Sequence, residues 1–363
     1  MKMVFVNATS MTGGGALSIL KQFLETLKQN GDGLNVYVFC DIEKKDYEGE
    51  HIHIINVNTN LKWRKRITWD LWGMKRWSVQ NNINPDVVFS LQNTGIGGFS
   101  NTPQIVYLHQ SIPFSREIKW KINRAERKYW FYRYIYKFML RFSIPAHANI
   151  VVQTDWVREA VLQDFHWPDA QLHKYRPCIT KIDSAKIQPF DMGEKIILFY
   201  PTSPPPFKNS NLLYRALAWI KENDSLEDIH LVLTLESDNE TLKKLEEFRI
   251  SEAVKFIGSV TYEEVVRWYA TSHALLFPSL IETFGLPLLE AQQFGIPIIA
   301  VDLPYAREAC SNYAGVKFLP KDNPEAWGKT IIDLRKKLPA KIPINVDGTN
   351  QWWDLIDWIK VLK

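Results

Sequence analysis

The sequence predicts an α/β protein with two doubly wound domains, each built around a parallel sheet. Short apolar runs alternate with helical patterns in both halves of the chain. The length of 363 residues is more than one ordinary hydrophobic core holds. Between the two halves, residues 176–194 have little periodicity and contain two prolines. We therefore expect domains at residues 1–180 and 190–345, followed by a C-terminal segment at 346–363.

In the first domain, six short apolar runs bounded by turn residues predict strands. They span residues 3–6, 36–40, 52–57, 87–91, 105–108 and 150–152. A glycine loop follows the first run, and a helix is expected over residues 16–30. Thr154 is a suitable N-cap for a helix over residues 156–164, because its hydroxyl can accept a hydrogen bond from a free backbone N–H group.

The second domain repeats this alternation. Strands are expected at residues 196–200, 229–235, 254–257, 275–277 and 298–301. Helices are expected at residues 211–222, 241–248, 286–294 and 325–337. Thr261 and Glu264 have the spacing of a capping box for one further helix, and Asn323 precedes Pro324 at the start of the last one. A terminal amphipathic helix is expected over residues 351–362.

Two carboxylates flank one loop of the second domain, and this loop is the most informative part of the sequence. Glu282 follows a short apolar strand, and Glu290 lies eight residues later, about one turn inside a helix that has Pro287 in its first turn. A helix that begins here leaves backbone N–H groups free to face an anion. These donors are expected near Thr283, Phe284, Gly285 and Leu286.

The motifs around this loop form an ordered series between residues 256 and 308. The series comprises Phe256-Ile-Gly258, Thr261-Tyr-Glu-Glu264, Phe277-Pro-Ser279, Glu282-Thr-Phe-Gly-Leu-Pro287, Glu290-Ala291, Gly295-Ile-Pro297 and Tyr305-Ala-Arg-Glu308. It resembles the E-x7-E signature of the family-4 retaining glycosyltransferases, enzymes with the two-domain GT-B fold. The alternative is that Glu282 is a loop charge and Glu290 a solvated residue on a helix face.

The resemblance implies two Rossmann-like domains facing a central cleft. It also implies that the first domain binds the acceptor, that the second binds the nucleotide sugar, and that the C-terminal helix crosses back to the first domain. Three tryptophans of this helix are then expected to pack on the first domain. They are Trp352, Trp353 and Trp358.

The resemblance assigns roles to three charged residues of the second domain. Glu290 would accept hydrogen bonds from both ribose hydroxyls of the donor, an arrangement strengthened by its charge. Glu282 would lie against the hydroxyl groups of the donor sugar. Lys208 follows a strand and precedes a helix, so its ammonium group is expected at the carboxyl ends of the strands, beside the pyrophosphate. Members of the family often carry an arginine five or six residues earlier, whereas this chain has Thr202 and Ser203 there.

The first domain has its own candidate residues at strand ends. Gly13, Gly14 and Gly15 follow the first strand and open a helix, so their backbone can approach a phosphate or a sugar closely. The glycines do not have the spacing of a dinucleotide-binding fingerprint, and a simple tight turn is the alternative. Their position matches the N-terminal glycine loop of the resembled family, whose members also have a histidine in the place of His109 that contacts the donor sugar.

Together with Lys208 and Glu282, His109 completes the expected catalytic set. A structural histidine is the alternative interpretation of this residue. Amide side chains at two strand ends are weaker candidates for contacts with the acceptor. They are Gln92, Asn93 and Gln110.

The sequence indicates neither a metal centre nor a cofactor. No Asp-x-Asp motif and no histidine cluster is found, so we expect a metal-independent enzyme whose donor is a substrate, a nucleotide-diphosphate sugar. The three cysteines have no metal-ligand spacing and are expected to be buried thiols. The N-terminus lacks an apolar core of signal-peptide length, and no apolar run has the length of a membrane span. We expect a cytoplasmic protein, peripheral on the inner face of the cell membrane.

The positive charge of the chain is concentrated in residues 114–142. This segment has nine basic and two acidic residues, whereas the net charge of the whole chain is only +4. It also has ten aromatic residues. We expect it to bind an anionic membrane surface and bring the enzyme to a lipid-linked acceptor. The alternative is that Trp130, Tyr134 and Phe138 face the core while the basic residues are merely solvated.

The sequence therefore predicts a retaining hexosyltransferase. It would transfer a hexose from a nucleotide-diphosphate sugar to a glycan or a lipid-linked saccharide, in the biosynthesis of lipopolysaccharide O-antigen or of a capsule. One alternative is a GT-B sugar-nucleotide epimerase or hydrolase. Another is a basic, aromatic nucleic-acid or membrane binding protein, although nucleic acid is not an expected partner. The resemblance suggests front-face attack, while a double displacement through a carboxylate nucleophile stays open.

Overall fold

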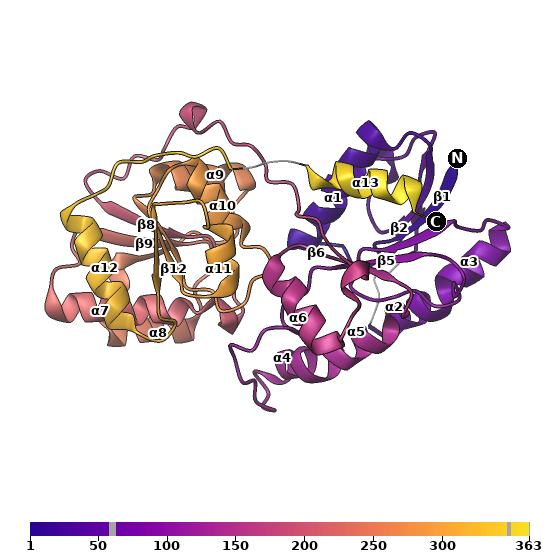
Figure 1. The fold of residues 1–363 in the computed structure, drawn as a ribbon. Helices are drawn as coiled ribbons and strands as arrows, with labels where there is room; N and C mark the ends of the chain where they lie inside the picture. The colour runs from indigo at the N-terminus through magenta and orange to yellow at the C-terminus, as the bar shows by residue number, and fades with distance from the viewer. Residues whose placement is uncertain (58–62, 347–349, 363) are drawn as a thin grey trace. The chain divides into compact units, whose positions relative to one another are not determined.

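The computed structural model describes residues 1–57, 63–346 and 350–362. The chain divides into two compact units, each containing one parallel sheet (Figure 1). The first unit comprises Met1–Cys178 and Thr349–Lys363, and the second comprises Ile179–Gly348. The predicted fold class, an α/β protein with two Rossmann-type parallel sheets, is confirmed.

The first unit has a seven-stranded sheet in the order β3-β2-β1-β4-β5-β6-β7. Its strands are β1 (Lys2–Asn7), β2 (Leu34–Cys40), β3 (Ile52–Asn56), β4 (Val87–Ser90), β5 (Gln104–Leu108), β6 (Asn149–Val152) and β7 (Leu172–Lys174). All neighbouring pairs are parallel. The order reverses direction between β1 and β4, which makes the carboxyl ends of these two strands the switch point of the sheet.

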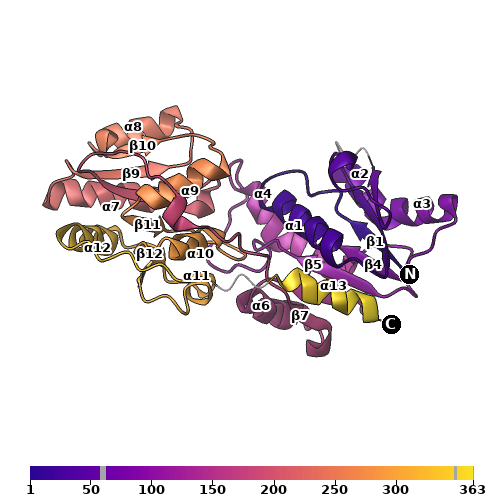
Figure 2. The same ribbon diagram turned by 90° about the horizontal axis from the view of Figure 1, so that it is seen from above.

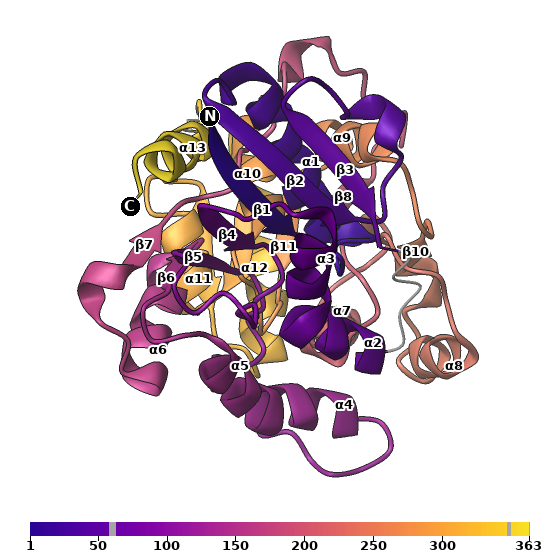
Figure 3. The same cartoon turned by 90° about the vertical axis from the view of Figure 1, so that its right-hand side faces the viewer.

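Alternate residues of these strands point to opposite faces of the sheet, and a hydrophobic core lies on each face. One face packs on α1 (Gly14–Asn30) and on the C-terminal helix α13 (Gln351–Val361), which lie side by side in Figures 1 and 2. The opposite face packs on α3 (Met74–Asn81), α5 (Lys137–Ser143) and α6 (Asp155–Phe165). Figure 3 shows α3 and α5 together with the short helices α2 (Trp63–Thr68) and α4 (Arg127–Trp130). A π-helical turn joins α2 to α3 over Trp69–Gly73, and another joins α4 to α5 over Phe131–Tyr136.

The second unit has a six-stranded parallel sheet in the order β10-β9-β8-β11-β12-β13. Its strands are β8 (Ile196–Tyr200), β9 (Ile229–Leu233), β10 (Val254–Phe256), β11 (Ala274–Phe277), β12 (Ile298–Val301) and β13 (Val316–Leu319). The order reverses between β8 and β11, so this sheet repeats the doubly wound pattern of the first.

The helices of the second unit are α7 (Ser210–Asn223), α8 (Asn239–Glu247), α9 (Tyr262–Thr271), α10 (Leu286–Gln293), α11 (Pro304–Ala309) and α12 (Pro324–Lys336). The capping box of Thr261 and Glu264 opens α9 as predicted, since the Thr261 side chain accepts from Glu264 N and the Glu264 carboxylate accepts from Thr261 N. Asn323 caps α12 by accepting from Ala326 N at 3.0 Å.

The prediction for the C-terminal tryptophans is wrong at one position. Trp352 is buried, and its ring stacks on Tyr107 with a centroid distance of 5.1 Å. Trp358 lies against His173 at 4.4 Å. Trp353 is 39% exposed, because each helical residue is turned about 100° from its neighbour and Trp353 faces away from α1.

One alternative is excluded, and one further prediction needs correction. The alternative that Tyr134 and Phe138 face the core is wrong, since these side chains are 37% and 62% exposed. Of the three cysteines, Cys40 and Cys310 are buried thiols as expected, but Cys178 is only half-buried.

Candidate functional site

The switch point of the second sheet brings Lys208 and Glu282 together. Lys208 ends a short 3₁₀ turn after β8, and Glu282 lies in the loop after β11, the strand paired with β8. The Lys208 ammonium group lies 2.5 Å from Glu282 Oε1. Both side chains are largely shielded, with 18% and 16% exposed. The two residues predicted for pyrophosphate and donor sugar therefore form one ion pair at the place where open α/β sheets bind ligands.

Hydrogen bonds fix the loop that carries Lys208. The Tyr200 hydroxyl donates to the Lys208 carbonyl oxygen at 2.7 Å, and Leu280 N donates to the Phe207 carbonyl oxygen at 2.7 Å. Asn209 has a left-handed backbone with φ of 57° and begins α7. The loops after β8 and β11 thus hold each other, which sets the position of the ammonium group.

Glu290 lies in α10 and is half-buried. Its Oε2 accepts a hydrogen bond from the Tyr269 hydroxyl at 2.8 Å. Burial raises the pKa of Glu290, and hydrogen bonds from Tyr269 and Tyr262 oppose this rise. A carboxylate that is desolvated in this way gains from any further donor that reaches it, such as a ribose hydroxyl. The sequence did not indicate either tyrosine, because α9, which carries them, is distant from Glu290 along the chain.

The loop before α10 has the backbone geometry expected of an anion site. Gly285 is the N-cap residue with φ of 75°, a left-handed conformation that favours glycine. Glu282, Thr283 and Leu286 are half-buried. Phe284 is 7% exposed and packs with Leu289 in a small apolar cluster, so only its backbone is available to a donor substrate.

In the first unit the switch point lies between β1 and β4, and the glycine loop follows β1. Gly13 is the N-cap residue of α1, and Gly14 has φ of 55°. A Cβ atom added at Gly13, Gly14 or Gly15 would meet no atom of the chain within 4 Å. Only Gly14 requires glycine for its backbone conformation. The space above the other two is open to a ligand.

This openness allows a test of the glycine loop. We expect Gly15→Ala to lower kcat/KM for transfer about 10-fold, because a methyl group would hold off a ligand that approaches the backbone. The unfolding midpoint should stay or rise, since alanine favours a helix over glycine by about 0.8–1 kcal/mol. Gly49→Ala is the matched control, because Gly49 also has open space. Unchanged kinetics of Gly15→Ala would show that the loop is only a turn.

The amides after β4 are engaged within the chain. Gln92 Oε1 accepts from Thr9 Oγ1 at 2.9 Å and from Ser10 N at 3.0 Å. Asn93 Oδ1 accepts from the backbone N–H groups of His109 and Gln110, at 2.8 and 3.0 Å. These two side chains thus position the loops after β1 and β5. Their role as contacts to the acceptor stays a prediction, as does that of Gln110, which is half-buried.

Asp70 anchors this network, and the sequence analysis missed it. It lies in the π-helical turn between α2 and α3, and its carboxylate accepts hydrogen bonds from three side chains. Asn7 Nδ2 and Gln92 Nε2 donate to Oδ1 at 2.8 and 2.5 Å, and Thr94 Oγ1 donates to Oδ2 at 2.9 Å. Burial raises the pKa of Asp70 to about 6. No local pattern could have indicated a cluster whose members come from three distant segments.

His109 is neutral in this environment. Burial lowers its pKa to about 4, and its Nε2 lies 2.9 Å from the Leu91 carbonyl oxygen. His109 directly follows the carboxyl end of β5, and its uncharged ring can still form hydrogen bonds there. A contact with the donor sugar is compatible with this state, whereas a role as a charged acid at neutral pH is not.

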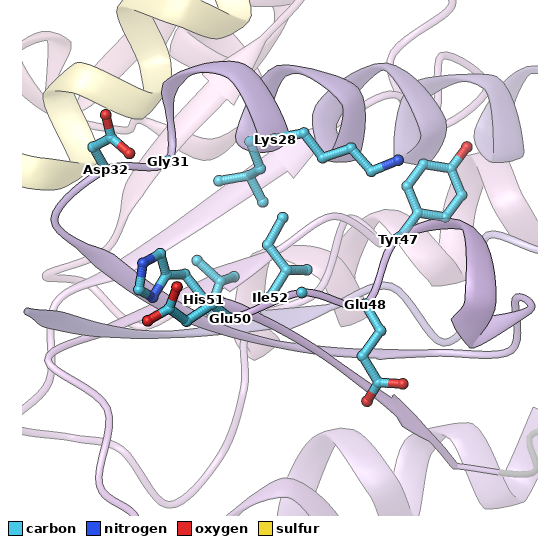
Figure 4. A pocket seen from close by; sticks show the side chains of 11 residues that line it. Lys28, Gly31, Asp32, Tyr47, Glu48, Glu50, His51 and Ile52 are labelled. Atoms are coloured by element: carbon cyan, nitrogen blue, oxygen red, sulfur yellow. The ribbon is translucent and has the colours of Figure 1, made fainter.

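A pocket of about 200 Å³ lies on the first unit, and Figure 4 shows Lys28 of α1 extending toward Tyr47 along it. The Lys28 ammonium group lies 4.6 Å from the centre of the Tyr47 ring. The pocket is bounded by the end of α1 and by His51, just before β3. It thus lies at the amino ends of the strands, opposite the switch point. Among the described residues no group of three or more histidine, cysteine, aspartate or glutamate side chains has the arrangement of a metal site.

Comparison with known proteins agrees with this geometry. Residues 180–340 match the family model of the glycosyl transferases group 1. A curated relative, the O-antigen chain mannosyltransferase RfbU of Salmonella typhimurium, is 21% identical over 248 residues, which are 67% of this chain and 68% of the relative.

Two solved structures share the fold over almost the whole chain. Sucrose-phosphate synthase from Thermosynechococcus elongatus has a TM-score of 0.69 at 15% identity, with 99% of this chain and 96% of the other covered. WaaG, a glycosyltransferase involved in lipopolysaccharide biosynthesis, has a TM-score of 0.67 at 13% identity, with coverage of 99% and 100%.

The fold is that of the GT-B glycosyltransferases, with two units that each contain a parallel sheet of Rossmann type. The stretch of the second unit that matches the model of the glycosyl transferases group 1 contains Lys208, Glu282 and Glu290. The predicted enzyme class is thereby confirmed.

Proposed function

We propose that this glycosyltransferase transfers a hexose from a nucleotide-diphosphate sugar to a glycan or a lipid-linked saccharide, with retention of the anomeric configuration. The observation that carries the proposal is the pairing of Lys208 and Glu282 at the switch point, within the stretch that matches the family model. Breaking a glycosidic bond to a diphosphate leaves negative charge on the phosphate. A shielded ammonium group and the backbone N–H groups before α10 would stabilise that charge.

The finer assignment is to the family-4 enzymes with an E-x7-E motif. Glu282 and Glu290 supply the two carboxylates, one paired with Lys208 and one hydrogen-bonded by the Tyr269 hydroxyl. In this proposal Glu290 accepts from the ribose hydroxyls, Glu282 from the donor sugar, and Lys208 moves from Glu282 to the pyrophosphate. The first unit would bind the acceptor.

A thermal-shift screen of nucleotide diphosphates and their hexose conjugates tests this proposal. A ligand at 100 times its Kd stabilises the native state by about 2.7 kcal/mol, which corresponds to several degrees. We expect one nucleotide diphosphate to stabilise the protein and its monophosphate to do so less. If no nucleotide shifts the transition at millimolar concentration, the donor assignment is wrong.

We expect transfer to be independent of a metal ion. Lys208 and the N–H groups before α10 are the chain's own means of stabilising the leaving group. Activity in EDTA should stay within about a factor of two of that in buffer, since no step requires a Lewis acid. A chelated enzyme that is inactive and regains activity with manganese would contradict this expectation.

The lipid-linked form of the acceptor is proposed from the surface of residues 114–142, here called the α4–α5 surface. Its exposed apolar side chains are Ile122, Tyr134, Ile135, Phe138 and Phe142. Phe142 is 82% exposed, and the last four follow helical spacing along the π-helical turn and α5. Exposed aromatic rings with cations beside them are typical of segments that bind a membrane interface.

Not all nine basic residues of this surface are available to a membrane. Arg116 and Lys137 bind the Asp164 carboxylate at 3.0 and 2.6 Å. Arg133 donates to the Pro113 carbonyl oxygen at 2.8 Å, and Arg141 to that of Phe165 at 3.1 Å. These four hold the helices in place. The other five are exposed: Lys119, Lys121, Arg124, Arg127 and Lys128.

This division sharpens the test for membrane binding. We expect Arg124, Arg127 and Lys128 replaced together by Gln to weaken sedimentation with anionic vesicles, by about 1 kcal/mol for each cation at low salt. Transfer to a soluble acceptor should be unchanged. Binding of the wild type should fall between 0.05 and 0.5 M salt, as the screening length shortens from about 14 to about 4 Å. A protein that ignores anionic vesicles at low salt would refute this part of the proposal.

The proposed location is the cytoplasmic face of a membrane. In the described residues no helix combines the length and the apolar composition that crossing a bilayer demands. The α4–α5 surface and the relation to an O-antigen mannosyltransferase support attachment at the membrane surface and a role in O-antigen or capsule assembly.

A further inference from the structure

A second apolar surface lies on the first unit, away from the α4–α5 surface in sequence. It is an open groove of about 620 Å³, here called the α3 groove. The groove is lined by Leu71, Trp72, Lys75, Arg76, Val79, Gln80 and Gly98. Leu71, Trp72 and Val79 are 41%, 65% and 66% exposed. Large side chains gathered on one surface in this way mark an interaction site more often than scattered ones do.

The helix beneath the groove, α3, packs one side into the core and exposes an apolar side chain among polar ones on the other. Its inner side is fixed in the core, where Met74 is fully buried and the Trp77 ring packs edge-on against Phe5 and Phe39. Its outer side exposes Val79 beside Arg76 and Gln80, and Trp72 is exposed in the π-helical turn just before it. Neither Trp72 nor Val79 belongs to that core. An amphipathic helix that only covers a sheet carries polar residues on its outer side, so this outer side calls for a partner.

The loop beside α3 is shaped to leave the groove open. Gly97 N donates to the Asp70 carbonyl oxygen at 2.8 Å. A Cβ atom at Gly98 would lie 2.7 Å from Lys75 Cβ, so the absence of a side chain there lets the Lys75 stem lie flat. The Lys75 ammonium group then rests 5.0 Å from the centre of the Phe99 ring, at the rim of the groove.

The charge around the groove is positive. Residues 63–81 contain five basic residues and one acidic residue, Asp70. The Asp70 carboxylate is turned inward, toward Asn7, Gln92 and Thr94, and therefore does not offset the outer charge. Arg64, Lys65 and Arg76 are exposed. An apolar centre with cations at its rim complements an anionic lipid, whose chains are apolar and whose headgroup is negative.

We propose that the α3 groove is a lipid-binding surface that inserts Trp72 and Val79 among the chains of an anionic bilayer. It lies on the same face of the seven-stranded sheet as the α4–α5 surface, opposite α1 and α13 (Figures 1 and 3). Two separate insertion points on one face fix the orientation of the first unit on the membrane, which one point cannot do. This inference rests on the proposed function for its biological meaning. Its test is separate, because vesicle binding is measured without the donor and without transfer.

The test uses the full chain and vesicles of phosphatidylglycerol and phosphatidylcholine. We expect Trp72→Gln with Val79→Gln to raise the apparent dissociation constant for these vesicles about 10-fold or more. The matched control is Trp353→Gln with Val361→Gln, which removes an exposed tryptophan and an exposed valine of the same unit. Vesicles whose acyl chains carry bromine give a second measurement, because bromine quenches tryptophan fluorescence only at close contact. Trp72→Phe should lose part of the quenching, and Trp353→Phe should lose none.

The outcomes of these vesicle-binding measurements distinguish the α3 groove from the α4–α5 surface. Wild-type vesicle binding by the Trp72 and Val79 variant overturns the inference and leaves the α4–α5 proposal intact. Loss of binding in this variant alone, with the Arg124, Arg127 and Lys128 variant unaffected, supports the inference and refutes the α4–α5 surface. If the variant is poorly folded, the quenching of Trp72→Phe decides, since that change keeps an aromatic ring. Equal binding to neutral vesicles, or self-association that depends on Trp72, would show that the groove serves another partner.

Discussion

Replacing Lys208 by alanine should lower kcat/KM for hexose transfer about 10²-fold or more, the scale of losing one charge-directed contact with the leaving group. The Lys208 ammonium group lies at the switch point, where we propose that the pyrophosphate binds. Lys208→Arg should retain part of the activity, because it keeps the charge but changes its geometry. Steady-state kinetics with a soluble acceptor give these values.

The ion pair with Glu282 requires a control. Lys208→Ala leaves a shielded carboxylate without its cation, which lowers stability for a reason unrelated to the leaving group. The double variant Lys208→Ala with Glu282→Gln removes that charge. We expect it to recover the unfolding midpoint and not the transfer. If transfer returns in the double variant, Lys208 serves only to neutralise Glu282.

Replacing Glu290 should reduce transfer about as much as replacing Lys208 does. Its effect on stability should differ from that of the Lys208 variant. We expect Glu290→Ala to lower kcat/KM about 10²-fold or more. Glu290→Gln, which can still accept from Tyr269, should lower it about 30-fold, because two charge-assisted hydrogen bonds to the ribose become neutral. Near-wild-type turnover in both variants would remove Glu290 from the site.

The raised pKa of Glu290 determines the direction in which the stability of the variants and the pH dependence of donor binding should change. The folded chain holds the proton of Glu290 more tightly than the unfolded chain does, so the ionised form reduces stability at neutral pH. The unfolding midpoint of Glu290→Gln without ligand should therefore not fall. Donor binding by the wild type needs the carboxylate, so its affinity should decrease as the pH falls through the raised pKa. The Gln variant should lack this step.

Most strands were predictable because they are short apolar runs between turn residues, and parallel strands buried on both faces need such runs. The edge strands β7 and β13 were not predicted, because polar or charged residues interrupt them. The pairing of β8 with β11 follows from the doubly wound order, and it explains why Lys208 and Glu282 meet although 73 residues separate them in the sequence. The region of α2 and α3 was not predicted. Its π-helical turn interrupts the helical period, and its tryptophans face both the core and the surface.

The hydrogen-bond partners of the candidate residues could not be predicted from the sequence, because they come from distant segments of the chain. Burial, which raises the pKa of Glu290 and of Asp70, depends on side chains from distant segments. Neither the hydroxyl of Tyr269 nor the three donors to Asp70 follow from local spacing. The sequence could place Glu290 in a helix but could not show that the Tyr269 hydroxyl of α9 lies against its carboxylate.

The central claim is acceptor-dependent, retaining hexose transfer, and product analysis tests it most directly. The protein is incubated with uridine and guanosine diphosphate hexoses, with and without a lipid-linked saccharide, and the products are identified by mass spectrometry and proton NMR. We expect release of the nucleotide diphosphate that depends on the acceptor and equals the new glycoside in amount, with the anomeric configuration of the donor preserved. Free hexose or an epimerised nucleotide sugar formed without the acceptor would contradict the claim and indicate a hydrolase or an epimerase.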